Sequence, residues 1–262
     1  MKKLLMIGFL VLIISSFHKK EEIYRYIPNN VFGPGEEIEY KIHYSIFTAA
    51  VGRVVISDKL YNIHGRTCYK IDIYGKTVGL FDLIIRVRDN WGSYLDTASI
   101  VPHKFYRTLE EGSYRKYETT EFDHVNDTAM VTTLDKVTKE VATIEYFKTP
   151  DNVQDLVSGY YYLRLLDLND YHPGDTISVD AFMDDETYDF KIKYIGKETI
   201  KTKIGKINAL IMSPIMPENK LFNGEEAIKF WVSDDINRIP LKVKAKMFIG
   251  AVEVDITSFN PG

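Results

Sequence analysis

The sequence contains a single cysteine, Cys68, among its 262 residues. One thiol cannot form an intrachain disulfide, so the hydrophobic core alone must hold the fold together, and the chain is long enough for that. Long apolar runs are also scarce. The run at Leu4–Ile14 is too short to cross about 30 Å of hydrocarbon comfortably as a helix. The net charge is only −4, which argues against nucleic acid as a bulk electrostatic partner.

Motifs that carry chemistry are missing as well. The sequence has no phosphate-binding loop, no dinucleotide-binding glycine pattern and no nucleophile elbow. Five of its six histidines follow position 20, show no ligand spacing and are predicted to be surface or turn residues: His43, His64, His103, His124 and His172. We therefore predict no catalytic residue, no metal site and no cofactor, and an enzyme ranks third among the function classes.

Residues 1–17 have the pattern of a signal peptide. Lys2 and Lys3 precede the apolar run, and Ser15 and Ser16 follow it. This pattern predicts an exported protein of the periplasm or cell envelope that is soluble after cleavage. The alternative is an uncleaved anchor, which would be the chain's only contact with a membrane.

Residues 21–262 are predicted to form a single β-rich domain. Ile38, Tyr40, Ile42 and Tyr44 alternate with charged or polar residues, which is the pattern of a strand with one buried face. Similar runs recur at intervals of about 8–12 residues, as in a meander. They include Arg66–Tyr74, Leu80–Val87, Trp91–Asp96, Thr128–Leu134, Thr176–Phe182 and Ile239–Phe248. We predict an all-β, mainly antiparallel fold, sandwich-like or a partly open β-barrel, with one helix packed on the concave side.

That helix is predicted at about residues 150–168, where the apolar period changes to that of a helix. Pro150 suits a first helical position, and Asp155 with Ser158 offers a second start one turn later. The predicted helix has an apolar face, formed by Leu156, Val157, Tyr160 and Leu163, which is expected to face the sheet. Asp155, Ser158 and Tyr162 fall on the opposite side.

Arg164 lies within the predicted apolar face. A guanidinium cannot shed its charge, so a buried one needs an acidic partner, and we predict an ion pair with a strand. The candidate partners are Asp82, Asp89, Asp96 and Glu118. The alternatives are an arginine that faces a ligand cavity and one that extends to water.

Several segments together resemble an exported bacterial family known as domain-of-unknown-function family 3108. They include GEEIEYKIHY at Gly35–Tyr44, QDLVSGYYYLR at Gln154–Arg164 and FWVSDDINRIPLKV at Phe230–Val243. The resemblance covers nearly the whole chain after the leader and implies an envelope protein built mostly of antiparallel strands, with no established activity. The last segment is also similar to the final hairpin of bacterial lipoprotein-carrier folds, where a curved sheet surrounds a lid helix.

Two function classes follow from the sequence. The first is a non-catalytic carrier that holds a lipid-like or glycan-like ligand between the sheet and the helix. Its candidate ligand-binding residues are Arg164, Tyr160, Asp155, Ser158 and Tyr162. The second is a structural or assembly factor with a filled core, which contacts an envelope protein through strand edges or the polar loop Pro214–Glu225, itself a candidate lid.

Overall fold

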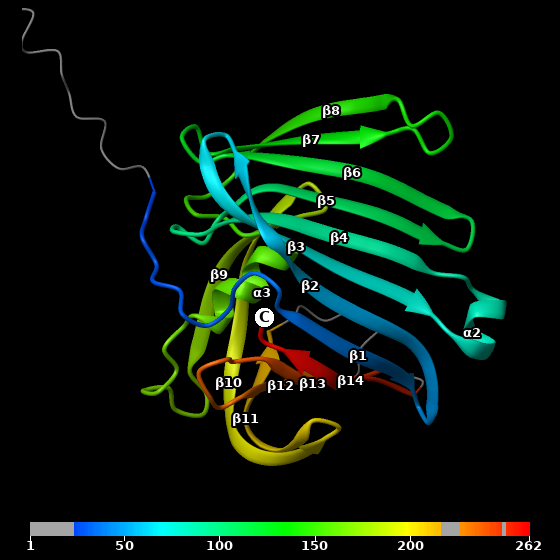
Figure 1. Cartoon of the computed structure of the whole chain (residues 1–262), viewed down its shortest axis with the longest axis vertical. Coiled ribbons are helices and arrows are strands. Elements are labelled where there is room, and N and C mark those ends of the chain that lie inside the picture. The colour runs from blue at the N-terminus through cyan, green and yellow to red at the C-terminus, as the bar shows by residue number, and fades with distance from the viewer. Residues whose placement is uncertain (1–23, 216–225, 248–249) are drawn as a thin grey trace, which may run out of the picture.

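The computed structural model of the chain describes residues 24–215, 226–247 and 250–262. In these residues, strands form one fourteen-stranded antiparallel sheet that curls round a short central helix (Figure 1). The predicted all-β, antiparallel class with an open-barrel shape is confirmed. Of the two predicted arrangements the structure has the partly open barrel, because every strand of the described residues belongs to one sheet.

With the exception of Leu80–Val87, the alternating runs form strands close to where the pattern predicts them. In the first half the strands are β1 (Glu37–Tyr44), β2 (Phe47–Ile63), β3 (Arg66–Thr77), β4 (Arg88–Asp96), β5 (Pro102–Glu111), β6 (Tyr114–Asp123), β7 (Thr128–Leu134) and β8 (Val141–Lys148). In the second half they are β9 (Thr176–Met183), β10 (Glu186–Thr202), β11 (Gly205–Pro214), β12 (Ile228–Ser233), β13 (Pro240–Lys246) and β14 (Ala251–Asn260).

The order of strands leaves β8 and β9 at the two edges of an open sheet. From β1, the chain adds strands outward to β8 at one edge; it then passes to the opposite edge and returns from β9 to β14, which pairs with β1. The connection between the two edges contains the helix α3 (Leu156–Arg164). Just before it, Gln154 pairs with Ala181 of β9 in an isolated parallel bridge, so this connection covers part of the β9 edge. One segment therefore bridges the gap between the two ends of the sheet.

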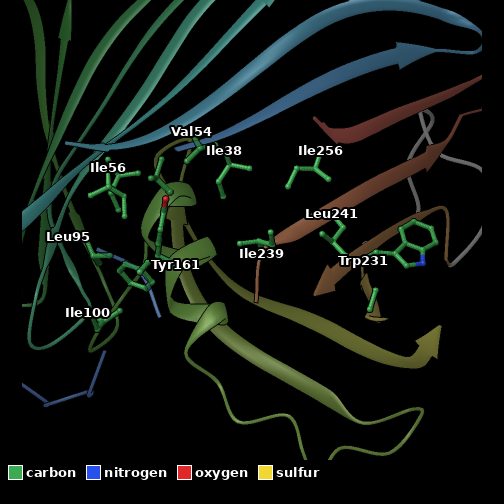
Figure 2. Close-up of a cluster of buried hydrophobic side chains, with 14 residues drawn as sticks. Ile38, Val54, Ile56, Leu95, Ile100, Tyr161, Trp231, Ile239, Leu241 and Ile256 are labelled. Carbon is green, nitrogen blue, oxygen red and sulfur yellow. The ribbon is translucent and has the colours of Figure 1, made fainter. Parts of the chain in front are cut away.

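The helix α3 packs into the main hydrophobic core, as predicted for a helix on the concave side. Figure 2 shows the Tyr161 ring among Ile56, Leu95 and Ile100, with Ile239 and Leu241 towards the other end of the cluster. The helix is shorter than predicted, because it begins after Asp155 rather than at Pro150 and ends at Arg164. Of the two predicted starts, the later one is correct.

The predicted strand Leu80–Val87 is wrong. Gly79 has a φ of 57°, which ends the extended backbone after β3, and the next residues form the helix α2 (Gly79–Ile84). The described residues thus contain two helices, α2 and α3, where the sequence predicts one. No residue of α2 is buried, and Leu80, Leu83 and Ile84 are exposed. A short apolar run does not distinguish helix from strand by itself, which explains the error.

The predicted signal peptide at residues 1–17 and the greater part of the predicted lid loop, residues 216–225, lie outside the described residues. No helix in the described part of the chain is long and apolar enough to cross a membrane.

Candidate ligand-binding site

The start of α3 is fixed to the concave face of the sheet through Asp155. Its Oδ1 accepts hydrogen bonds from the backbone N–H groups of Val157 (2.8 Å) and Ser158 (2.7 Å), and Ser158 Oγ accepts one from the Asp155 N–H at 2.8 Å. This reciprocal arrangement is a capping box. The remaining carboxylate oxygen, Oδ2, accepts a hydrogen bond from Ser93 Oγ of β4 at 2.6 Å. The predicted role of Asp155 as a cap is confirmed.

The Asp155 carboxyl is almost completely buried, at 1% exposure. Burial raises its pKa to about 6, against the lowering effect of hydrogen bonds from Ser93, Ser158 and Val157. The group is therefore partly protonated in mildly acidic solution, a point that matters for the stability of the helix.

The end of α3 is fixed by the predicted arginine. Arg164 donates from Nη1 and Nη2 to the two carboxylate oxygens of Glu36 at 2.6 and 2.8 Å, and both side chains are 1% exposed. Arg164 Nε donates to the Asn237 carbonyl at 3.0 Å, and the Tyr161 hydroxyl donates to Glu36 at 3.1 Å. The prediction of a buried ion pair is confirmed, and each of the three guanidinium nitrogens donates to a group of the protein.

The partner of Arg164 is none of the four acids that the sequence suggests. Glu36 lies just before β1, 128 residues away in sequence, and no local pattern connects the two. The four candidates have other partners: Asp82 pairs with Arg88, Asp96 with Arg66, Glu118 with Arg107, and Asp89 accepts from the Glu110 N–H.

The orientation predicted for the helix is also partly wrong. Its buried residues are Val157, Ser158, Tyr161 and Arg164, whereas Leu156 is 44% exposed. Ser158 is buried despite its hydroxyl, because the capping box satisfies its polar atoms. Tyr162 has Arg25 over its ring at 4.7 Å.

Tyr160 lines a cavity, which we call the helix cavity. It measures about 410 Å³ and lies between α3 and the concave face of β9 and β10. Most of its lining is apolar: Leu156, Gly159, Tyr160 and Leu163 from the helix; Val179, Ala181, Phe182 and Met183 from β9; Tyr188 and Phe190 from β10; and Ile215. Asp155 also lines it, so the structure brings two of the five predicted ligand-binding residues to this cavity.

A second, smaller cavity of about 140 Å³ shares Leu156, Phe182 and Met183 with the helix cavity. We call it the hairpin cavity, because the turn between β9 and β10, Asp184 and Asp185, closes one side of it. Its other walls come from the concave faces of β4, β5 and β6: Trp91, Phe105, Arg107, Glu118, Thr120 and Phe122.

Charged side chains connect the hairpin turn to the sheet at this cavity. Arg107 Nε lies 2.7 Å from Glu118 Oε1, and Arg107 Nη1 lies 2.7 Å from Asp184 Oδ1. Burial alone would lower the pKa of Arg107, but Glu118 and Asp184 raise it. The sequence gives no indication of this cluster, since Trp91, Arg107 and Glu118 become neighbours only through the pairing register of three strands.

A polar cluster lies elsewhere on the sheet, around Asp96. The carboxylate accepts from Arg66 Nε at 2.6 Å and lies 3.0 Å from Nε2 of His103, which is 1% exposed. The prediction that every histidine is a surface or turn residue is therefore wrong for His103. Among the described residues, no group of three or more histidine, cysteine or acidic side chains is arranged to hold a metal ion.

The fold defines an open, β-barrel-like protein with a helix inside its single curved sheet. The family described as Protein of unknown function (DUF3108) matches residues 39–257, and this chain belongs to that family. No curated protein matches the sequence.

Solved structures provide the fold comparison. A beta-barrel-like protein of domain of unknown function DUF1849 from Brucella abortus is 8% identical, with a TM-score of 0.53 over 88% of this chain and 99% of the other. This likeness shows a shared fold. A protein provisionally named an exported protein with a YmcC-like fold, from Bacteroides fragilis, is 9% identical over 90% of this chain and 99% of its own, with a TM-score of 0.34. One provisionally named a lipoprotein, from Parabacteroides distasonis, is 10% identical over 90% and 99%, with a TM-score of 0.30.

Proposed function

We propose that this protein is an exported, non-catalytic envelope protein that binds an apolar, lipid-like ligand in the helix cavity. The observation that carries the proposal is the convergence of half-exposed apolar side chains on one concave space. Leu156, Met183, Tyr188, Phe190 and Ile215 are each 40–48% exposed, and all line this cavity. Apolar side chains left open to water around a cavity of several hundred Å³ are typical of a ligand site.

The chemistry of the lining favours a lipid-like ligand over a glycan-like one. Sugar hydroxyls need many hydrogen-bond partners, whereas the polar side chains of the lining are few, chiefly Gln154, Asp155 and Asp189. Asp155 is already occupied by capping α3 and by Ser93. The export signal predicted at residues 1–17 supports an envelope location.

Gly159 provides a direct test, because it lies in the middle of α3 and lines the helix cavity. The nearest atom to an added Cβ is Gln154 Cβ at 3.5 Å, an ordinary contact. Gly159→Leu should therefore fold at least as well as the wild type, since glycine costs about 0.5–1 kcal/mol in a helix relative to alanine. The leucine side chain should occupy the cavity and abolish binding of the uncharged fluorescent probe N-phenyl-1-naphthylamine.

The matched control is Gly159→Ala, which gains the same helix propensity without the bulk and should still bind the probe. Native mass spectrometry of protein purified from its own envelope should show a retained lipid-sized mass in the wild type and its loss in Gly159→Leu. If the wild type binds no probe, or if Gly159→Leu binds as well as Gly159→Ala, the proposal is wrong.

The alternative function is an assembly factor that contacts an envelope protein through a strand edge. One observation favours it: β8 forms one edge of the sheet, and its Val141, Ile144 and Tyr146 side chains are exposed. Open edges can accept a strand from another protein. The assay is complementation in the native host: the gene is returned to a strain from which it has been deleted, and recovery of detergent resistance is measured. Under this alternative, Ile144→Lys should abolish that recovery. Gly159→Leu should then leave that recovery unchanged.

A further inference from the structure

The hairpin cavity contains buried hydrogen-bond donors that the described protein leaves unused. Arg107 is only 9% exposed, and its Nη2 has no hydrogen-bond partner among the described residues. The Trp91 indole N–H is likewise buried without a partner in the part of the chain that the structure describes. The two residues are directly paired across β4 and β5, and both line the hairpin cavity.

Unused buried donors are unusual, because burying a polar group without a partner costs about 1–3 kcal/mol. The two donors belong to residues on neighbouring strands that line the same cavity, so a hydrogen-bond acceptor supplied from outside the chain could satisfy both. The hairpin cavity is small, at about 140 Å³, so it fits a head group rather than a whole lipid.

The position of the donors relative to the helix cavity gives the ligand its shape. Leu156, Phe182 and Met183 form a wall common to both cavities, and Leu156 and Met183 are 44% and 41% exposed, so close packing does not lock them in place. An apolar chain in the helix cavity can therefore continue past these side chains to the donors. A volume of about 410 Å³ is within the range of small-molecule sites, roughly 300–1,000 Å³, and so leaves room for an acyl chain.

The charges around the donors determine which acceptor fits. The cations Arg107 and Lys116 are already paired with Glu118, and Arg107 also with Asp184. Asp185 adds another carboxyl to the lining, and its pKa is raised by burial and by the charge of Glu118. The surroundings thus hold more acids than bases, and a carboxylate or phosphate head would be repelled more strongly than an uncharged carbonyl.

We propose that the ligand is an acyl chain with an uncharged, carbonyl-bearing head group, such as an ester, held by the Trp91 indole N–H and Arg107 Nη2 while its chain occupies the helix cavity. This proposal rests on the proposed function, because it requires the helix cavity to bind an apolar chain. It adds the chemical class of the head group and the orientation of the ligand.

The test compares three twelve-carbon probes that differ in head group: 1-monolauroylglycerol, laurate and dodecyltrimethylammonium. Each is titrated as a competitor against N-phenyl-1-naphthylamine bound to the wild type, and the uncharged ester should bind most tightly. Trp91→Phe keeps an aromatic ring but removes the donor, so it should weaken binding of the ester about fivefold, the effect of one hydrogen bond. It should leave the affinity for N-phenyl-1-naphthylamine, which has no carbonyl, unchanged.

A second measurement tests the orientation. In a Trp231→Phe background, Trp91 is the only tryptophan, because the chain has two. Monolauroylglycerol brominated near the ester should quench its fluorescence more than the same lipid brominated at the end of the chain. Circular dichroism checks that each variant is folded.

The outcomes separate the two proposals. If probe binding is blocked by Gly159→Leu but laurate binds as tightly as the ester, or Trp91→Phe has no effect on the ester, the head-group proposal fails and the proposed function stands. If the wild type binds none of the probes, both fail.

Discussion

The buried pair of Arg164 and Glu36 gives the sharpest stability prediction, because the chain contains its own control. Both side chains are 1% exposed and are joined by two charge-assisted hydrogen bonds. Removing one partner of such a pair leaves the other charge buried and typically costs about 3–5 kcal/mol. Arg164→Met should therefore lower the free energy of unfolding by about that amount, even though methionine restores apolar packing.

The control is the ion pair made by Glu37, the residue that follows Glu36. Glu37 pairs with Arg53, but here the side chains are 30% and 49% exposed, so water already screens the charges. Arg53→Met should cost less than about 1 kcal/mol, as exposed pairs usually do. Both variants lose an arginine that is paired with a glutamate, and they differ mainly in burial.

The double variant Glu36→Gln/Arg164→Met should recover a large part of the loss, because it leaves no unpaired charge. The assay is urea unfolding at neutral pH, with the four members of the cycle compared at constant slope. If Arg164→Met costs no more than Arg53→Met, or if the double variant shows no recovery, the pair does not hold α3 in the way that its geometry implies.

Two further predictions concern Asp155 and Cys68. Burial raises the pKa of Asp155 to about 6, above the value of 3.8 for the free group, so its contribution to stability is fully present below about pH 4 and is lost as the pH rises through 6. The reference variant is Asp155→Asn, which keeps an oxygen for the two backbone N–H groups. Between pH 4 and 7, the free energy of unfolding of the wild type, measured with urea, should fall by about 3 kcal/mol relative to that of this variant. A difference that stays constant with pH would contradict this. Burial, with the charge of Asp96 adding to it, raises the pKa of the Cys68 thiol to about 12, so the folded protein should not react with a thiol reagent at pH 8, and reducing agent should leave its melting temperature unchanged.

The strands could be predicted because each carries its own signal. The run Thr128–Leu134 matches β7 at both ends, and the alternation from Ile38 to Tyr44 places β1 within a residue. Alternation reports only that one face of a strand is buried, however, and that is equally true in a sandwich and in a curled single sheet. The arrangement of the sheet depends on β1 pairing with β14, which involves the two ends of the domain.

The candidate site was predictable only where its contacts are local. Asp155 and Ser158 are three residues apart, so the capping box appears in the sequence. The need of Arg164 for an acid was also predictable, since it follows from charge and burial alone. The identity of that acid, Glu36, was not, and neither was the meeting of Trp91 with Arg107, because each depends on strand pairing over a long distance in sequence.

The helix α3 has two physical roles that act through different parts of its surface. Its capping box at Asp155 and its ion pair at Arg164 fix its two ends, one to Ser93 of β4 and the other to Glu36 just before β1. The side chains between those ends, including Gly159 and Tyr160, form a wall of the helix cavity. Because the two ends hold the helix in place, the cavity wall can remain apolar and loosely packed without loss of the fold. Substitutions at the ends should therefore change stability, whereas substitutions at Gly159 should change the binding of the ligand that we propose.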